Sequence, residues 1–205
     1  DRATSGVLLF ALTPQVRQAL GAAFETREVA KRYVAVVRGW TEAAGTIDYS
    51  LARIVDDADP RTWARSDEPQ PALTRYARLA TAELPVRVDR YPTSRYCLVE
   101  LEPLTGRRHQ LRRHLKHIDH PIVGDTTYGQ GRHNRLFRER YGCHRLLLAA
   151  TALAFAHPVT GVALRIDAPL EGAFAQVVDA LGWREALEAS ARAALRADPI
   201  EAGPV

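Results

Sequence analysis

Stretches with the residue pattern of β-strands follow one another along this sequence, and only some are separated by a helical pattern. Apolar residues dominate or alternate with polar ones in the stretches 30–37, 73–83, 96–101, 146–155 and 162–166. This pattern is typical of strands. The repeating strand–helix–strand order that builds parallel sheets does not occur. We therefore predict an α+β fold with a mostly antiparallel mixed sheet and flanking helices.

The first twelve residues combine an acid, a turn of small residues and an apolar run. Six apolar residues, Val7–Leu12, are bounded by Ser5-Gly6 and by Thr13-Pro14, which predicts a short buried strand. Asp1 would then stand at the entrance to a rigid element, where a catalytic carboxylate is well supported. The alternative is that Asp1 is a terminal residue without a role.

Helical patterns occupy fewer segments. Thr13 and Pro14 predict the start of a helix over 14–27. The stretch 107–116 is predicted as a helix that packs through Leu111 and Leu115, and helices are also expected over 173–181 and 184–196. We expect a loop at 56–60 and a polar, arginine-rich connection over 126–142.

Size and composition fit one main core. The 205 residues contain no methionine and begin with aspartate, so we expect that upstream residues are missing. No apolar run approaches the roughly 18 residues of a membrane span. Cys97 and Cys143 lack the spacing of a redox or zinc motif, so we expect reduced, buried thiols in a cytoplasmic protein.

Positive charge is concentrated in one part of the sequence. The net charge is +4 and the sequence pI is about 9.3. The stretch 107–120 holds five Arg or Lys residues against one acid, and 132–145 holds five arginines against one acid. By contrast, 42–68 is rich in acids. Such a concentration of cations is typical of a nucleic-acid footprint.

Four short motifs occur in a fixed order. They are D-x-x-T-S-G at Asp1–Gly6, K-x-Y at Lys31–Tyr33, T-G-R-x-H-Q-L-R at Thr105–Arg112, and P-I-x-G-D at Pro121–Asp125. With these motifs the sequence resembles the RluA-type pseudouridine synthase family from Asp1 to about Leu170. The family normally has His-Arg-Leu before the aspartate, which is absent here. The resemblance implies the pseudouridine synthase catalytic fold over 1–183, lacking its N-terminal strands, followed by a helical tail over 184–205 with a disordered end.

The resemblance also implies the catalytic residues. Asp1 would attack the target uridine at C1′ or C6, and the sequence does not decide between them. Arg112 would pair with Asp1, and a guanidinium can keep a carboxylate ionised. Tyr33 would stack on the base and help to remove its C5 proton, with Lys31 lining the same pocket. The alternatives are a phosphate contact for Arg112 and a packed core tyrosine for Tyr33. The reaction involves no redox change, so it requires no redox cofactor or metal.

The target base must leave its stack, at a cost of a few kcal/mol that phosphate contacts must offset. Leu111 is the one apolar candidate for substrate binding, although core packing is the stronger expectation for it. The cationic candidates for RNA contacts are Arg107, Arg108, Arg113, Lys116, Arg132 and Arg135. His114, His117 and His120 are spaced by three but lack acidic or cysteine partners at zinc-site spacing, so helix packing or RNA contact is favoured over a metal site.

The stretch 124–135 is closest to the tRNA-modifying branch of the family. This implies a monomeric enzyme acting on tRNA at uridine 65 of the T-arm, with no membrane partner. Three alternatives stay open, namely the same chemistry on 23S ribosomal RNA, a non-catalytic RNA-binding module that keeps the fold, and a metal-dependent hydrolase that uses the three histidines.

Overall fold

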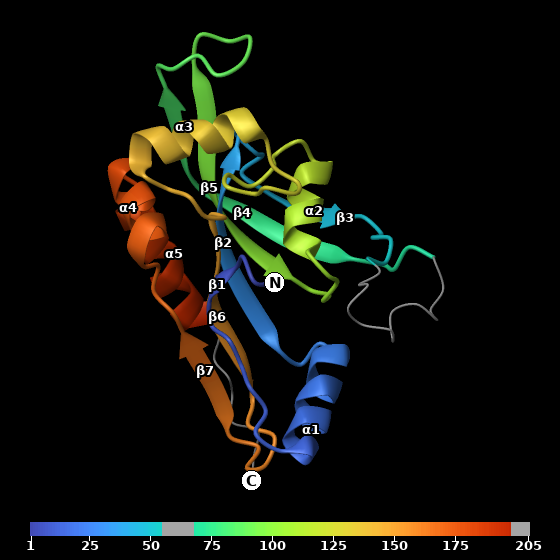
Figure 1. The fold of residues 1–205 in the computed structure, drawn as a ribbon. Coiled ribbons are helices and arrows are strands. Elements are labelled where there is room, and N and C mark those ends of the chain that lie inside the picture. Colours follow the sequence, from blue (N-terminus) through green and yellow to red (C-terminus); the bar gives the residue numbers. More distant parts are fainter. Residues whose placement is uncertain (55–67, 198–205) are drawn as a thin grey trace.

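The computed structural model describes residues 1–54 and 68–197 and contains a seven-stranded sheet flanked by helices (Figure 1). The predicted loop at 56–60 and the predicted disordered end of the tail, 198–205, lie outside the described residues. The strands are β1 (Ser5–Gly6), β2 (Ala30–Arg38), β3 (Ala44–Asp48), β4 (Leu73–Leu84), β5 (Ser94–Pro103), β6 (Leu148–Ala156) and β7 (Ala163–Asp167). The helices are α1 (Pro14–Glu25), α2 (Gln110–His117), α3 (Gly131–Tyr141), α4 (Gly172–Ala180) and α5 (Arg184–Ala197).

The spatial order of the sheet is β1-β6-β2-β5-β4-β3, with β7 also beside β6. Strand neighbours are antiparallel except β1 and β6, which pair in parallel. The predicted α+β fold with a mostly antiparallel mixed sheet is thereby confirmed. Successive side chains along its long central strands point to opposite faces of the sheet, and both faces are apolar. This explains why the sequence predicted these stretches as strands.

Helices cover both faces of the sheet (Figure 1). On one face, Val34 and Val36 of β2 join a cluster that includes Phe137 of α3 and Phe174 of α4. On the other face, the intervening Ala35 and Val37 pack in a second cluster with residues of α2. The sheet therefore lies between two hydrophobic cores. The face with α2 carries Tyr33, the predicted catalytic residue of β2.

The helix predicted over 14–27 is confirmed as α1, which packs at one end of the sheet (Figure 1). The Thr13 hydroxyl accepts a hydrogen bond from the Val16 amide at 3.3 Å, so it caps the helix start. Leu20 is buried against Leu153 and Phe155 of β6. The predicted apolar face is thus only partly buried, because Phe24 remains 41% exposed.

The predicted strand over Val7–Leu12 is wrong. Only Ser5 and Gly6 form a strand, and the side chains of Leu8 and Phe10 are largely exposed. Gly6 has φ 98°, and a Cβ there would lie 1.9 Å from the Ala150 carbonyl oxygen. One edge of β6 pairs with β2. Its other edge pairs first with β1 and then, further along β6, with β7. The chain after Gly6 therefore finds no free strand edge to pair with.

Two further elements differ from the sequence predictions. The stretch predicted as an arginine-rich connection contains α3, in which only His133 and Phe137 are buried. A four-residue spacing with a single apolar member is too weak a signal for a helix. Strand β3 lies in the acid-rich stretch 42–68, for which no strand was predicted, and within it Ile47 is the buried residue.

A network of three side chains, named here the histidine network, holds α3 against the sheet. The Tyr96 hydroxyl of β5 lies 2.7 Å from His133 Nδ1, and His133 Nε2 lies 3.0 Å from Asp89 Oδ2. Burial lowers the pKa of His133, which is therefore neutral at pH 7. Tyr96 then donates to Nδ1, and the Nε2 proton is donated to the carboxylate.

The predicted helix over 184–196 is confirmed as α5. Its Ser190 hydroxyl donates to Glu100 on β5 at 2.6 Å, and Trp183 just before it donates to the Thr81 carbonyl on β4 at 3.2 Å. α5 therefore contacts the sheet, and the predicted division of the chain at residue 183 stays a prediction. Both cysteines are buried with free thiols, as expected. None of the helices in the described ranges has the length and apolar character needed to cross a membrane.

Candidate active site

The site is built around the start of α2, which begins at Gln110 rather than at the predicted Arg107. His109 has φ 54°, in the left-handed region that non-glycine residues rarely adopt. The Gln110 Oε1 atom accepts hydrogen bonds from the Thr105 hydroxyl at 2.8 Å and from the Arg107 amide at 3.0 Å. This side chain closes the turn and aims the first turn of α2 at the N-terminal residues. Backbone strain of this kind concentrates at functional sites.

Arg112 bridges two carboxylates, and the three residues are named here the arginine network. Its Nε donates to Asp125 Oδ2 at 2.7 Å and its Nη2 to Asp125 Oδ1 at 2.8 Å. Its remaining Nη1 lies 3.2 Å from each carboxylate oxygen of Asp1. The hydrogen bonds with Asp125 raise the pKa of Arg112, so the guanidinium stays charged.

Local contacts also hold the Asp1 carboxylate. It accepts the Ala3 amide at 3.2 Å and the Thr4 hydroxyl at 3.1 Å. His109 Nε2 lies 3.9 Å from Asp1 Oδ1. Burial, and then the neighbouring Arg112 and Arg108, lower the pKa of His109. The imidazole beside Asp1 is therefore neutral at pH 7, and it can exchange hydrogen bonds without adding charge.

Tyr128 closes the other side of this arrangement. Its hydroxyl lies 3.1 Å from His109 Nδ1, and its ring lies 5.1 Å from Arg112 Cζ. Lys116 Nζ is 6.0 Å from the centre of the same ring. Two cations thus face one aromatic ring, which stabilises them electrostatically.

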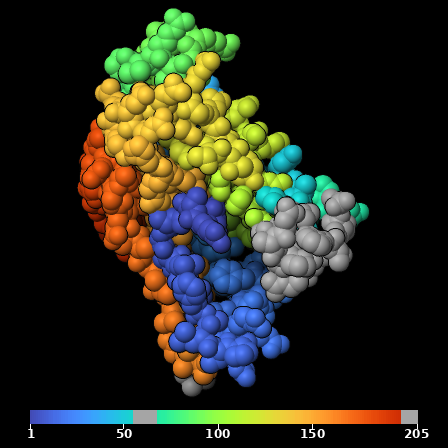
Figure 2. Space-filling model, viewed as in Figure 1, coloured from blue at the N-terminus to red at the C-terminus, as the bar shows by residue number. Residues whose placement is uncertain are grey.

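Tyr33 and Lys31 lie on the sheet face that carries α2. Tyr33 pairs with Ala150 of β6, and Ala150 pairs on its other side with Gly6 of β1. The strand that follows Asp1 is therefore two strands from Tyr33. Lys31 Nζ donates to the Thr105 carbonyl at 3.3 Å, beside the start of α2. Figure 2 shows the surface hollowed between the N-terminal segment and α1, where Figure 1 draws the first part of β2.

Burial changes the ionisation of both side chains on β2. It raises the pKa of the Tyr33 phenol, which is half-buried and protonated at pH 7. Burial, and then the charge of Arg27, lower the pKa of the Lys31 ammonium. The first part of β2 thus carries a neutral phenol and a lysine whose pKa is lowered.

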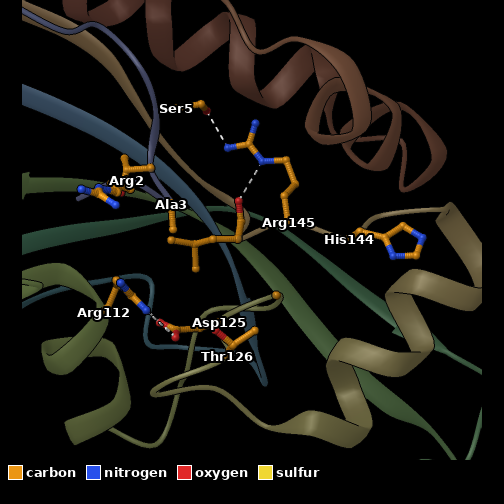
Figure 3. A pocket seen from close by; sticks show the side chains of 11 residues that line it. Arg2, Ala3, Ser5, Arg112, Asp125, Thr126, His144 and Arg145 are labelled. Atoms are coloured by element: carbon orange, nitrogen blue, oxygen red, sulfur yellow. Dashed lines mark hydrogen bonds and ion pairs between the residues drawn. The ribbon is translucent and has the colours of Figure 1, made fainter.

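A separate pocket of about 450 Å³ opens on the far side of the Arg112–Asp125 pair. Figure 3 shows that pair on one wall and the hydrogen bond between Arg145 and Ser5 on the opposite side. Arg145 Nη2 donates to the Ser5 hydroxyl at 2.7 Å and to the Leu148 carbonyl at 3.3 Å. Tyr33 and Lys31 do not line this pocket. Of the arginine network, Arg112 and Asp125 line this pocket.

The remaining predicted RNA-binding residues fall into two groups. Arg107 and Arg113 have backbone partners, since they donate to the Pro71 and Ala52 carbonyls at 3.2 Å and 2.8 Å. Leu111 is 6% exposed in the core of the α2 face. The more exposed cations lie on or next to α2 and α3 and are Arg108, Lys116, Arg132 and Arg135. Arg132 also pairs with Asp89 at 3.3 Å.

The three evenly spaced histidines each have another partner. His114 bonds with the Thr74 hydroxyl and the Tyr49 carbonyl, both at 3.0 Å. His117 stacks on the Tyr49 ring, and His120 donates to the Arg38 carbonyl. Across residues 1–54 and 68–197, no group of three or more His, Cys, Asp or Glu side chains could hold a metal ion.

Comparison with known proteins places this site in a family. The model of the RNA pseudouridylate synthase family matches residues 1–117. The tRNA pseudouridine synthase C of Vibrio cholerae is 46% identical over 91% of this chain and 77% of its own length. That of Salmonella typhi is 49% identical over 90% of this chain and 71% of its own. The chain belongs to the RNA pseudouridylate synthase family. It is therefore a pseudouridine synthase, an isomerase that acts on RNA.

Solved structures of this family agree with the fold. Human RNA pseudouridylate synthase domain containing 1 covers 89% of this chain with a TM-score of 0.62 and 28% identity. Human RNA pseudouridylate synthase domain containing 4 covers the same share with a TM-score of 0.64. The family resemblance of the sequence motifs is thereby confirmed.

Three residues of this pseudouridine synthase site were not singled out from the sequence. Asp125 lies in a motif, but the sequence assigns it no role. Its contact with Arg112 depends on the path of the loop between them, which the sequence pattern does not predict. His109 lies inside the T-G-R-x-H-Q-L-R block. Its positive φ could not be predicted, because no residue type in the block indicates a left-handed backbone at that position. Tyr128 follows Asp125 by three residues, and only the turn between them brings its ring to Arg112.

Proposed function

We propose that this pseudouridine synthase isomerises one uridine of tRNA and that Asp1 is its nucleophile. The observation that carries the proposal is the contact of the Asp1 carboxylate with the buried guanidinium of Arg112. A carboxylate held ionised at a supported position can form and later release a covalent bond to a nucleoside, as in glycosidases. The curated relatives that are named for tRNA support the choice of substrate.

The proposed chemistry balances without an oxidant or a metal. An Asp1 oxygen adds to C1′ or to C6 of the uridine, and the bond between C1′ and N1 breaks. The uracil turns, a bond forms between C1′ and C5, and the bond to Asp1 is released. The C5 proton leaves and N1 gains a proton. The composition of the nucleoside is unchanged, because the proton lost to solvent from C5 is balanced by the proton gained at N1.

Tyr33 is proposed to stack on the flipped base. Since burial raises the pKa of its phenol, it meets the substrate in the neutral form. The neutral phenol can therefore stack on the base and form hydrogen bonds. It can accept the C5 proton only after it has given up its own hydroxyl proton. Lys31 would line the same hollow, anchored at the Thr105 carbonyl.

The proposed target is uridine 65 of the T-arm. The exposed cations of α2 and α3 would contact phosphates around that arm, which offsets the few kcal/mol needed to flip a base. These are Arg108, Lys116, Arg132 and Arg135. Arg107 and Arg113 are less exposed than these four, and Leu111 is in the core.

Release of tritium from C5-labelled uridine tests this proposal. The full chain should release about one tritium per tRNA transcript, and a transcript with cytidine at position 65 should release none. Asp1→Ala should reduce the rate by more than about a thousandfold, because the covalent step loses its nucleophile. Asp48→Ala is the matched control, since it removes an exposed carboxylate of β3 far along the sheet order from β1.

Each of the following outcomes would contradict a different part of the proposal. Release from the transcript without uridine 65 would show that the target is another uridine of that tRNA. Release from labelled 23S ribosomal RNA, with none from tRNA, would show that ribosomal RNA is the substrate. An Asp1→Ala variant within about tenfold of the wild-type rate would exclude Asp1 as the nucleophile. A chain that binds tRNA but releases no tritium would be a non-catalytic RNA-binding module.

A further inference from the structure

The guanidinium of Arg112 is shared unequally between its two carboxylates. Two of its nitrogens make short parallel bonds with Asp125, at 2.7 Å and 2.8 Å. Only Nη1 faces Asp1, at 3.2 Å from each oxygen. Two parallel bonds fix both the plane and the rotation of a guanidinium. The direction from which Arg112 approaches Asp1 is therefore set by Asp125.

Asp125 is itself held rigidly. It is 2% exposed, and its Oδ1 accepts the amides of Thr127 and Tyr128, both at 2.9 Å. Burial alone would raise the pKa of the Asp125 carboxyl, but hydrogen bonds from Arg112, Tyr128 and Thr127 outweigh it and the pKa lies below its usual range. Asp125 is therefore ionised wherever the enzyme is folded near neutral pH.

Helix α3 anchors the loop that carries Asp125. The Asn134 side chain donates to the Asp125 carbonyl at 2.9 Å and accepts the Gly124 amide at 2.8 Å. Gly129 packs against the same residue so closely that a Cβ there would lie 2.3 Å from the Asp125 carbonyl oxygen. The position of the carboxylate is thus fixed by backbone and helix contacts that do not involve Arg112.

The charges explain why such an arrangement suits a nucleophile. An aspartate paired alone with a buried arginine is strongly stabilised as an anion, which makes it less reactive toward carbon. With Asp125 ionised, the positive charge of Arg112 is already balanced, and its longer contact with Asp1 is the weaker one. Asp1 is then held in place and kept ionised, and its carboxylate oxygens stay more nucleophilic than they would be in a strong ion pair.

We propose that Asp125 is a positioning residue that orients Arg112 and limits the hold of its charge on Asp1. The inference rests on the proposed role of Asp1 as the nucleophile. Asp125 lines the pocket beside Arg112, but its carboxylate bonds with Arg112 and with the Thr127 and Tyr128 amides rather than with Asp1. It would therefore act on Asp1 through Arg112. Asn134 would support the loop without taking part in the charge balance.

Asp125→Asn in the full chain tests the inference, because it keeps the shape of the side chain and removes its charge. The Asp1 carboxyl carbon is followed by NMR as pH is changed, in wild type and variant, with His109 titrated in the same spectra because its ring lies beside Asp1. The midpoint of the Asp1 titration should move to lower pH by about half a unit to one unit, since Arg112 then acts on Asp1 alone. This readout requires no substrate.

The rate of tritium release provides the second readout. In Asp125→Asn, kcat should fall by about 10- to 100-fold with KM for tRNA unchanged within about twofold, and the acid limb of the pH–rate profile should move to lower pH. Asn134→Ala is the matched control, which should lower the melting temperature but leave the Asp1 titration midpoint unchanged.

The outcomes separate this inference from the proposed function. An unchanged or raised Asp1 midpoint in Asp125→Asn overturns it, and so does an equal shift in Asn134→Ala. A lowered midpoint with no pseudouridine formed by the wild type would uphold the charge balance and overturn the proposed function instead. A variant that keeps the wild-type rate at every pH would show that the balance has no effect on catalysis, which also overturns the inference.

Discussion

Two networks of ionisable side chains in this protein each have three members but different surroundings. The arginine network joins Asp1 and Asp125 through Arg112, and Arg112 and Asp125 line an open pocket. The histidine network joins Asp89 to Tyr96 through His133, and Tyr96 is fully buried. Neither His133 nor Tyr96 lines that pocket. The first has three formal charges, two of them on the wall of a cavity, and the second has one charge and two neutral members.

This difference indicates different uses. Charges that face a cavity can act on a substrate, whereas a buried and fully hydrogen-bonded polar network mainly fixes one arrangement of the elements it joins. His133 and Tyr96 fasten α3 to β5, and α3 in turn holds the loop of Asp125 through Asn134. We therefore expect changes in the arginine network to affect rate most, and changes in the histidine network to affect stability.

The largest effect is expected from Arg112→Met. It removes the partner of Asp1 and leaves Asp125 buried without its cation, so tritium release should fall by more than about a thousandfold. The free energy of unfolding should fall by roughly 3–5 kcal/mol, the usual loss when one partner of a buried ion pair is removed. Both are measured on the same preparation, by the tritium assay and by urea denaturation.

Arg112→Lys sharpens that result. Lysine keeps a positive charge near Asp125 but cannot make two parallel bonds and still reach Asp1. It should recover part of the lost stability and little of the lost rate. If Arg112→Met instead left the rate within tenfold of wild type, the arginine network would be structural like the histidine network, and the comparison would fail.

An intermediate effect is expected from His133→Gln, on stability alone. At pH 7 the variant should lose about 1–3 kcal/mol of unfolding free energy, because Tyr96 loses a buried partner. The neutral His133 of the folded state has a lowered pKa, so the unfolded chain binds a proton first as pH falls below about 6.5. Wild type should therefore lose stability between pH 7 and pH 5 more steeply than the variant, so the difference between them shrinks.

Urea denaturation at several pH values measures this, with kcat per folded molecule as the control. The hydrogen bond from His133 lowers the pKa of Asp89, so that carboxyl titrates below this window. His114 is also buried with a lowered pKa, but it is present in both proteins and cancels in the difference. A parallel pH dependence in the two proteins, or a large loss of kcat, would contradict the assignment.

The smallest effect is expected outside both networks, from Arg135→Ala on the exposed side of α3. Binding of tRNA should weaken about two- to fivefold and the slope of log K against log salt should decrease by about one, with kcat unchanged. Arg17→Ala on α1 is the charge-matched control, because α1 lies at the opposite end of the sheet from α3 (Figure 1). Equal weakening by both variants would show that only net charge matters and that α3 makes no specific contact.

Much of the fold could be predicted from local patterns. The long strands β2, β4 and β5 alternate between two apolar faces, and α1 has both a cap and a proline at its start, so each is determined by neighbours in the sequence. Strand Val7–Leu12 was predicted by the same logic and does not form. Its six apolar residues lack a partner because β7 already occupies that side of β6. Helix α3 was missed because only two of its residues are buried.

The sequence by itself determined the family of this protein and which residues were predicted to be catalytic, since the motifs with Asp1, Tyr33 and Arg112 are short and stand in order along the chain. Only the tertiary structure decided how those residues share charge. Asp125 reaches Arg112 across thirteen positions and Asp1 reaches it across 111. Contacts between residues so far apart depend on how the elements pack, and Coulomb energies depend on distance and burial, neither of which a residue pattern contains.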